Sequence, residues 1–326
     1  MVIVRNNIRF VILLMVSSIV LSYIASLVDY DTALIAMQHA KISLVILAFI
    51  LSLLTLLVVS LRWVYLLRTI NVNFSIFWAY LSYLIGGFYG VVMPGTIGSD
   101  TFRVMVCKSR TNNSMSRILS SVIVERFLGV LALLLLVYVS WAFNQHALYQ
   151  FDFFVIPILI VTISAMALIL IWLFVDLSII KKFLSTLLYY HPKALDFINL
   201  ALDSINAISK KHLLIAFGYS VIAHFVEILA VYALSQALSI DINLGVFLII
   251  VPFVFLSSLL PISLGGMGLM EGILVFLLVK FGVTSSDAVL LAFLFLFNRL
   301  LVNMFGGIVQ VFIKKQVGDL INSDVN

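Results

Sequence analysis

Two stretches of the sequence combine chain-breaking residues with charged residues. The first follows an apolar run over 74–93 and reads Pro94-Gly95-x-x-Gly98-x-Asp100-x-x-Arg103. Proline ends an incoming helix and glycine lets the chain reverse, so we expect a turn and then a new helix capped by Ser99 or Asp100. The free N–H groups at the start of such a helix attract an anion, and Arg103 adds a guanidinium suited to phosphate.

The second stretch repeats this pattern after an apolar run over 244–260. It reads Pro261-x-Ser263-x-Gly265-Gly266-x-Gly268-x-x-Glu271 and continues as an apolar segment to about Phe281. Glu271 falls in the first turn of the outgoing helix. Both stretches also fit a simpler role as turn and capping residues. As complete sets they favour a binding function, because ionisable groups among apolar spans are costly and usually functional.

Arg299 interrupts the apolar segment 288–312. A lone arginine there costs about 2.5–3.5 kcal/mol on membrane-insertion scales, so its guanidinium must meet an acid, a carbonyl oxygen or a ligand phosphate. Glu271 and Glu227 are the acids available in that half of the chain.

Two further pairs of ionisable residues lie in apolar segments. Glu125 and Arg126 are adjacent in 118–141, and their alternatives are ligand binding or a salt bridge at the membrane surface. His224 and Glu227 are three residues apart and therefore share one helix face. For them the alternatives are a proton-sensitive pair facing a cavity and a structural hydrogen-bonded pair between helices.

The sequence contains no motif for a disulfide, a zinc site, nucleotide binding or a hydrolase nucleophile. Cys107 is the single cysteine, which excludes an internal disulfide and fits no zinc motif. A Walker loop, a dinucleotide fingerprint and a Gly-x-Ser-x-Gly elbow are all missing. We therefore expect no metal, no cofactor, no catalytic residues and no enzymatic activity.

Composition indicates the elements that carry these residues. Hydrophobic residues make up 64% of the chain, charged residues 10%, and the mean hydropathy is +1.24, against roughly 45–50% apolar and 25% charged in soluble domains. The outer surface must face lipid, where only helices and closed barrels satisfy the backbone. Long continuous apolar runs favour helices over alternating barrel strands. We therefore expect an all-α polytopic membrane protein.

Six runs are long enough to span a bilayer. They cover residues 10–28, 42–61, 118–141, 154–175, 213–235 and 288–312. The first follows Arg5 and Arg9 as a signal peptide would, but it is long for one, so we predict a retained helix.

The distribution of Lys and Arg predicts the topology. With the N-terminus inside and 74–117 entering and leaving on that side, Lys41 and Lys280 are the only basic residues in outside loops, as the positive-inside rule favours. The inside segments are then the N-terminus, 62–73, 94–117, 176–212 and 313–326. The same reasoning makes 244–282 a hairpin that enters from the outside.

The two halves then form a four-plus-four inverted repeat, 1–141 and 154–312, each with a re-entrant broken-helix hairpin. Such repeats with paired broken helices are typical of transporters, whose site lies between the repeats. The segment 176–212 contains helically spaced apolar residues, which predict two amphipathic helices on the cytoplasmic surface or else a solvated connector.

Together, the two glycine motifs, Glu125-Arg126 and Arg299 resemble the transmembrane region of the lysylphosphatidylglycerol synthase family, which are flippase-like membrane proteins. The resemblance covers nearly the whole chain, and the second glycine motif is its more specific part. It implies a flippase-like core with Asp100, Arg103, Glu125, Arg126, Glu271 and Arg299 at matching positions. We do not expect the soluble aminoacyl-transfer domain that some members carry, nor lipid aminoacylation.

We therefore expect a bacterial or archaeal inner-membrane protein, with both termini cytoplasmic, that moves an anionic or glycosylated lipid between leaflets. Its partners would be that lipid or a lipid-linked glycan, envelope-assembly proteins and further copies of itself, but no nucleic acid. The alternatives are a membrane-embedded transferase using Asp100, Glu125 or Glu271 as general base, and a non-transporting partner subunit. The predicted substrate-binding residues are Asp100, Arg103, Glu125, Arg126, His224, Glu227, Glu271 and Arg299.

Overall fold

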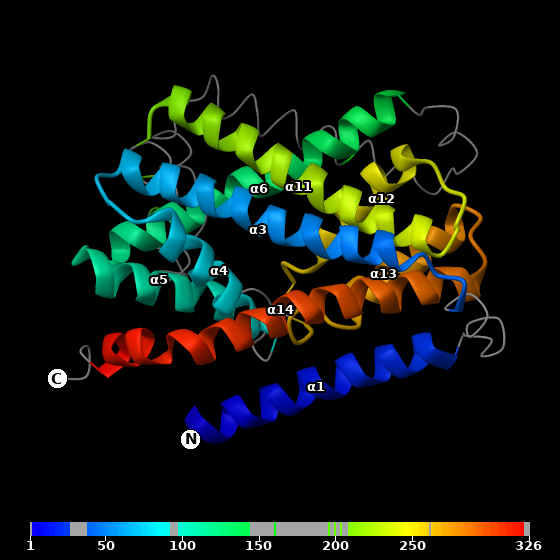
Figure 1. Ribbon diagram of the computed structural model, residues 1–326, viewed down its shortest axis with the longest axis horizontal. Coiled ribbons are helices and arrows are strands. Elements are labelled where there is room, and N and C mark those ends of the chain that lie inside the picture. Colours follow the sequence, from blue (N-terminus) through cyan, green and yellow to red (C-terminus); the bar gives the residue numbers. More distant parts are fainter. Residues whose placement is uncertain are drawn as a thin grey trace.

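Helices form all the regular elements that the computed structural model describes, which are residues 2–26, 38–91, 97–143, 208–260 and 262–322 with the single residues 160, 195, 199 and 203 (Figure 1). The all-α prediction is confirmed for these residues. The helices are α1 (Val2–Ser26), α3 (Ile42–Thr69), α4 (Ile76–Gly90), α5 (Ile97–Thr111), α6 (Met115–Phe143), α11 (Lys210–Ala237), α12 (Leu244–Ser257), α13 (Leu269–Lys280) and α14 (Ser285–Asn322).

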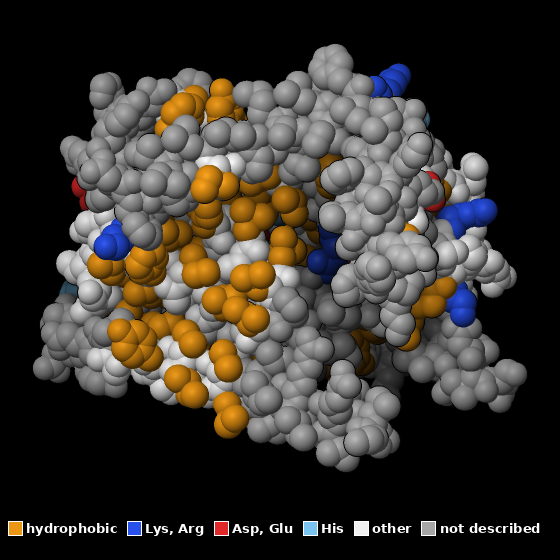
Figure 2. Space-filling model, turned by 180° about the vertical axis from the view of Figure 1, so that it is seen from behind, with side chains coloured by type: hydrophobic (Ala, Val, Ile, Leu, Met, Phe, Trp, Pro, Cys, Tyr) orange, Lys and Arg blue, Asp and Glu red, His pale blue; other side chains and the backbone are white. Residues whose placement is uncertain are grey.

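Several of these helices are long and apolar enough to cross a membrane. They are Ile42–Thr69, Met115–Ala142, Lys210–Ala237 and Ser285–Ile313, and Leu14–Ser26 and Leu244–Ser257 are shorter apolar helices. Hydrophobic side chains cover much of the described part of the face in Figure 2. The chain is a multi-pass membrane protein. The predicted span 154–175 and most of the predicted surface segment 176–212 lie outside the described residues.

Helix α3 corrects one predicted boundary. The span expected to end at residue 61 continues to Thr69, so Arg62 lies within α3 and not in an inside loop. No proline or glycine interrupts this run, and the left-handed Asn71 (φ 60°) follows its end. Arginine is a good helix former, and the buried charge of Arg62 is neutralised by a carboxylate of α6, as described below.

Two helical hairpins project into the molecule from opposite ends (Figure 1). The first is formed by α4 and α5, and the second by α12 and α13. Gly265, in the second turn, has φ +54°, and a Cβ there would lie 3.2 Å from the carbonyl oxygens of Gly90 and Val91. Glycine therefore lets the second turn pack directly on the end of α4. The first turn, with Pro94 and Gly95, and Pro261 of the second lie outside the described residues.

The long helix α14 packs on both hairpins. A Cβ at Gly306 would lie 2.0 Å from the carbonyl oxygen of Leu84 in α4, so the two backbones approach more closely than any side chain would permit. The main apolar core lies among α11, α12, α13 and α14. The start of α1 and the end of α14 lie at the same end of the molecule (Figure 1).

Candidate functional site

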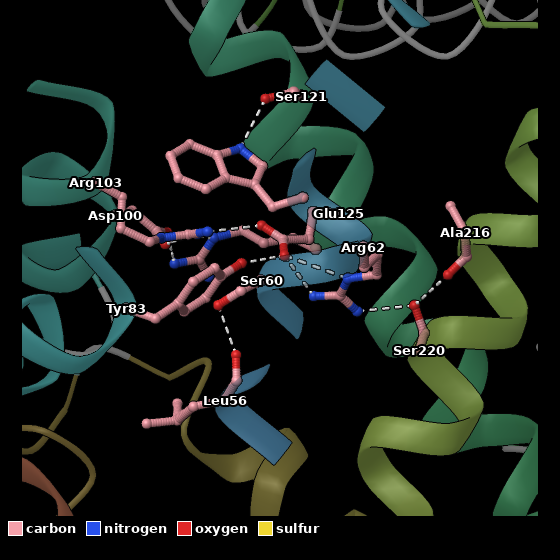
Figure 3. A network of polar contacts seen from close by, with 12 residues as sticks. Leu56, Ser60, Arg62, Tyr83, Asp100, Arg103, Ser121, Glu125, Ala216 and Ser220 are labelled. Atoms are coloured by element: carbon pink, nitrogen blue, oxygen red, sulfur yellow. Dashed lines mark hydrogen bonds and ion pairs between the residues drawn. The ribbon is translucent and has the colours of Figure 1, made fainter. Parts of the chain in front are cut away.

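Glu125 lies at the centre of a buried polar network between the first hairpin and the long helices (Figure 3). Arg62 donates from Nε and Nη2 to its Oε1 at 3.2 and 2.7 Å. Arg103 donates from Nη1 to its Oε2 at 2.9 Å, and the Tyr83 hydroxyl also donates to Oε1. Glu125 is 2% exposed and lies ten residues, about 15 Å, after Met115. Glu125 is therefore buried between helices.

Asp100 links this network to Arg126. Arg103 donates from Nη2 to Asp100 Oδ1 at 2.5 Å. Arg126 donates from Nε to Asp100 Oδ2 at 2.7 Å and forms a second bond from Nη2. Glu125 and Arg126 are thus neighbours in sequence with different partners. We call Arg62, Tyr83, Asp100, Arg103, Glu125, Arg126 and Ser220 the Glu125 cluster. Its arginines outnumber its carboxylates, so the cluster carries a net positive charge.

Neighbouring helices fix the geometry of this cluster. The guanidinium carbon of Arg103 lies 4.0 Å from the Tyr83 ring centroid and 4.9 Å from that of Trp63, a favourable placement for a cation. Trp63 is held by its indole N–H, which donates to Ser121 at 3.0 Å. Arg62 donates from Nη1 to Ser220 of α11 at 2.8 Å. The cluster therefore joins α3, α4, α5, α6 and α11.

A second cluster forms at the turn of the second hairpin, and we call Gly265, Gly268, Glu271 and Arg299 the Glu271 cluster. Arg299 donates from Nη1 to Glu271 Oε1 at 2.8 Å and from Nη2 to the carbonyl oxygen of Gly265 at 2.7 Å. Glu271 Oε2 accepts the Gly268 N–H at 2.6 Å, which caps α13 at its first turn. Arg299 thus pairs with one of the two acids that the sequence made available.

His224 and Glu227 lie between these clusters but are not bonded to each other. His224 points toward α6, where its Nε2 lies 3.6 Å from the position of a Cβ on Gly129. The Glu227 carboxylate instead accepts a long hydrogen bond of 3.4 Å from Ser52 of α3. Ser52 in turn accepts from Asn298 Nδ2 at 3.0 Å. Glu227 thus connects α11 to α3 and, through Ser52, to α14.

The two clusters open onto adjacent cavities. One, of about 260 Å³, is lined by Asp100, Arg103, Glu125 and Arg126. The other, of about 350 Å³, is lined by Glu227, Gly265 and Arg299. Both cavities share the same wall, made of Ser99, His224, Phe255 and Ser258. Figure 2 shows Lys or Arg atoms in a hollow within an apolar face.

Access differs among the predicted substrate-binding residues. The side chain of Arg126 is 36% exposed and that of Arg299 19%. Arg103 is only 3% exposed and both of its terminal nitrogens are bonded to carboxylates. Gly98 lies buried at the start of α5, and Gly266 adopts φ +79° in the second turn. Ser263 is buried there, and its hydroxyl has no hydrogen-bond partner.

Sequence reasoning missed Arg62, Tyr83, Ser52 and Asn298 as members of the site. The sequence could have indicated Arg62, because the chain remains apolar for several residues beyond it and so places the arginine inside a helix. Tyr83, Ser52 and Asn298 carried no such signal, since isolated tyrosines, serines and asparagines are tolerated in apolar helices without a role in a site. Among the described residues, no group of His, Cys, Asp and Glu side chains gathers as a metal site would.

The comparisons with known proteins agree with the motifs. No curated protein sequence matches the chain. A family described as Lysylphosphatidylglycerol synthase TM region matches residues 10–307, which include every residue of both clusters. The chain therefore belongs to the lysylphosphatidylglycerol synthase TM region family.

Proposed function

We propose that this protein translocates a polar lipid, with an anionic or glycosylated headgroup, between the leaflets of a membrane. The observation that carries the proposal is the pair of adjoining cavities at the place where the two hairpins meet, one lined by Arg103 and Arg126 and the other by Arg299. The net positive charge of the Glu125 cluster stabilises an anion such as a phosphate in a largely apolar protein, and Arg299 supplies a second guanidinium in the adjoining cavity. Membership of a lipid-related family points to the same substrate class.

An apolar groove beside the charged cavity supports a lipid rather than a free anion. The groove, of about 460 Å³, is lined by Ala40, Leu238, Leu290, Phe293, Leu294, Leu296, Phe297 and Leu300. Leu296 and Leu300 also line the cavity of Arg299. A headgroup at Arg299 and an acyl chain along α14 would therefore occupy neighbouring spaces. This combination of a few polar groups with apolar walls is typical of ligand sites.

We propose further that the two hairpins are re-entrant elements of a four-plus-four inverted repeat, 1–141 and 154–312. Their entry from opposite ends of the molecule (Figure 1) supports this arrangement. Irregular backbone at membrane depth is tolerated where it is buried in protein or lines a water-filled cavity. The Gly265 turn meets this condition, because it packs on α4 and lines the Arg299 cavity.

In this proposal the exposed arginines contact the headgroup and the buried ones hold them in place. Arg126 and Arg299 are the most accessible and would bind phosphate. Arg103 would fix Asp100, which orients Arg126. Translocation would follow from one repeat rocking against the other, which alternately opens the site to either side. The inner membrane, with both termini cytoplasmic, remains our proposed location.

A flipping assay in reconstituted vesicles tests this function. Wild-type protein should move fluorescent anionic lipids between leaflets, and the Arg299→Ala, Glu271→Ala double variant should move them much more slowly. Asp287→Asn is the matched control, because this acid lies at the start of α14 and bonds only to Thr284 at an exposed position. Wild-type rates in the double variant would remove these residues from the mechanism.

A further inference from the structure

Glu227 differs from the other acids inside the described helix bundle. Asp100, Glu125 and Glu271 each bond to an arginine. Among the described residues, no Lys, Arg or His nitrogen lies within salt-bridge distance of the Glu227 carboxylate, and its hydrogen bond from Ser52 is long, at 3.4 Å. A carboxylate among apolar helices without a counter-charge is costly. An ionised Glu227 therefore has no partner cation among the described residues.

Neutral oxygens surround this carboxylate. Ser52 and Thr55 are three residues apart on α3 and so share a helix face, and both line the Glu227 cavity. Asn298 of α14 is 2% exposed and donates to Ser52 at 3.0 Å. The Asn298 Oδ1 atom is buried and has no hydrogen-bond partner, and the buried Thr55 hydroxyl lies near the Glu227 carboxylate without a hydrogen bond of normal length. Buried polar atoms without partners are rare in native proteins. Thr55 lines the Glu227 cavity and Asn298 is linked to Glu227 through Ser52, so their oxygens point to a ligand at this place.

From this geometry we propose that Ser52, Thr55, Glu227 and Asn298 form a binding site for a sodium ion. The donors are all oxygens, which suit hard cations. A single carboxylate balances one positive charge, whereas a divalent ion would leave one charge uncompensated. A proton would neutralise Glu227 but would leave Asn298 Oδ1 without a partner. Sodium sites beside the substrate site occur in other transporters, where backbone carbonyl oxygens coordinate the ion.

The ionisable groups nearest the site lie on two neighbouring helices. His224 of α11 points away toward α6, and Arg299 of α14 is bonded to Glu271 and the Gly265 carbonyl. Arg299 is adjacent in sequence to Asn298 and lines the same cavity as Glu227. Sodium would cancel the negative charge of Glu227 and so favour an anion at Arg299. This coupling rests on the proposed function, while the ion site itself does not.

Sodium-dependent thermal stability of the purified full-length protein in lipid nanodiscs tests the site without any substrate lipid. The melting temperature of the wild type should rise with sodium chloride, and not with choline chloride at equal ionic strength, because an ion that binds only the folded state stabilises it. Glu227→Gln should weaken the apparent sodium affinity by about tenfold or more, since ligand charge sets cation affinity. Asn298→Ala should weaken the apparent sodium affinity by a smaller factor. This variant tests the site if Glu227→Gln does not fold.

Ser60→Ala is the matched control, because Ser60 is a buried hydroxyl of the same helix that bonds only to the carbonyl oxygen of Leu56. It should keep the sodium dependence of the wild type. Equal stabilisation by sodium and choline, or an unchanged sodium affinity in both Glu227→Gln and Asn298→Ala, would overturn the site. Flipping at the same rate in sodium and choline, with sodium binding intact, would overturn only the coupling. Sodium binding by a protein that flips no lipid would instead count against the proposed function alone.

Discussion

The Glu125 cluster joins side chains of five helices to one another, whereas the Glu271 cluster joins one side chain of α14 to a hairpin turn. In the first, Arg62 and Arg103 bond to the same carboxylate, and Arg103 also packs between two aromatic rings. In the second, Arg299 bonds to one carboxylate and to the backbone oxygen of Gly265. The first cluster has hydrogen bonds and ion pairs to several helices, and the second has few such contacts.

This difference suggests different roles: the Glu125 cluster holds its charges in place, and Arg299 can exchange its partners for a ligand. Breaking the Glu125 cluster would require several buried charged bonds to be lost together, so we expect it to stay fixed. Arg299 can exchange a carbonyl and a carboxylate for a ligand phosphate at lower cost, because its side chain is partly exposed to the cavity. The second hairpin is thus the better candidate for the part that responds to a ligand.

Glu125→Gln should have the largest effect on stability. It leaves Arg62 and Arg103 buried without their shared carboxylate, and removing one partner of a buried ion pair typically costs about 3–5 kcal/mol. Thermal unfolding in detergent would measure the loss. If Glu125→Gln and Glu271→Gln cost the same, the contrast between the two clusters would be wrong.

Glu271→Gln should destabilise the protein less than Glu125→Gln, and it should slow lipid flipping. The amide oxygen of glutamine can still accept the Gly268 N–H, so the start of α13 remains capped, but Arg299 loses its counter-charge. We expect a loss of about 1.5–3 kcal/mol, the usual value of a charged hydrogen bond, and slow lipid translocation in vesicles. Flipping at the wild-type rate would contradict a role for this pair in exchange.

Gly306→Ala tests whether the first hairpin must pack tightly on the helix that carries Arg299. The added Cβ would overlap the Leu84 carbonyl of α4, and overpacking a close contact typically costs about 1–3 kcal/mol. Gly218→Ala is the matched control, because a Cβ at this helical glycine meets no atom within 4 Å. The control should be neutral or slightly stabilising in the same unfolding measurement.

Arg126→Ala should have the smallest effect on stability. Its side chain is the most exposed of the arginines in the Glu125 cluster, and exposed ion pairs contribute about 0–1 kcal/mol. Flipping of anionic lipids should nevertheless fall, if Arg126 contacts the headgroup. Arg117→Ala, an exposed arginine at the start of the same helix, provides the control for surface charge. Equal flipping in both variants would assign Arg126 to structure only.

The elements of the described fold were largely predictable, and the site only in part. Continuous apolar runs predicted α3, α6, α11 and α14, because in lipid a helix bonds all its backbone polar groups internally. The two glycine motifs predicted the hairpins. The end of the span 42–61 was predicted wrongly, because an arginine was taken as the mark of a loop. Whether a charge ends a span depends on the partner it meets, and that partner lies far along the chain.

By itself, the sequence determined that the described part of this chain is helical and membrane-embedded, with two helical hairpins near charged residues. These properties follow from local composition and spacing. Only the tertiary structure decided that Glu125 pairs with Arg62 and Arg103 rather than with its neighbour Arg126, that Arg299 pairs with Glu271, and that Glu227 lies among neutral oxygens. Pairing depends on which helix faces meet, and residues far apart in sequence carry no local signal of that.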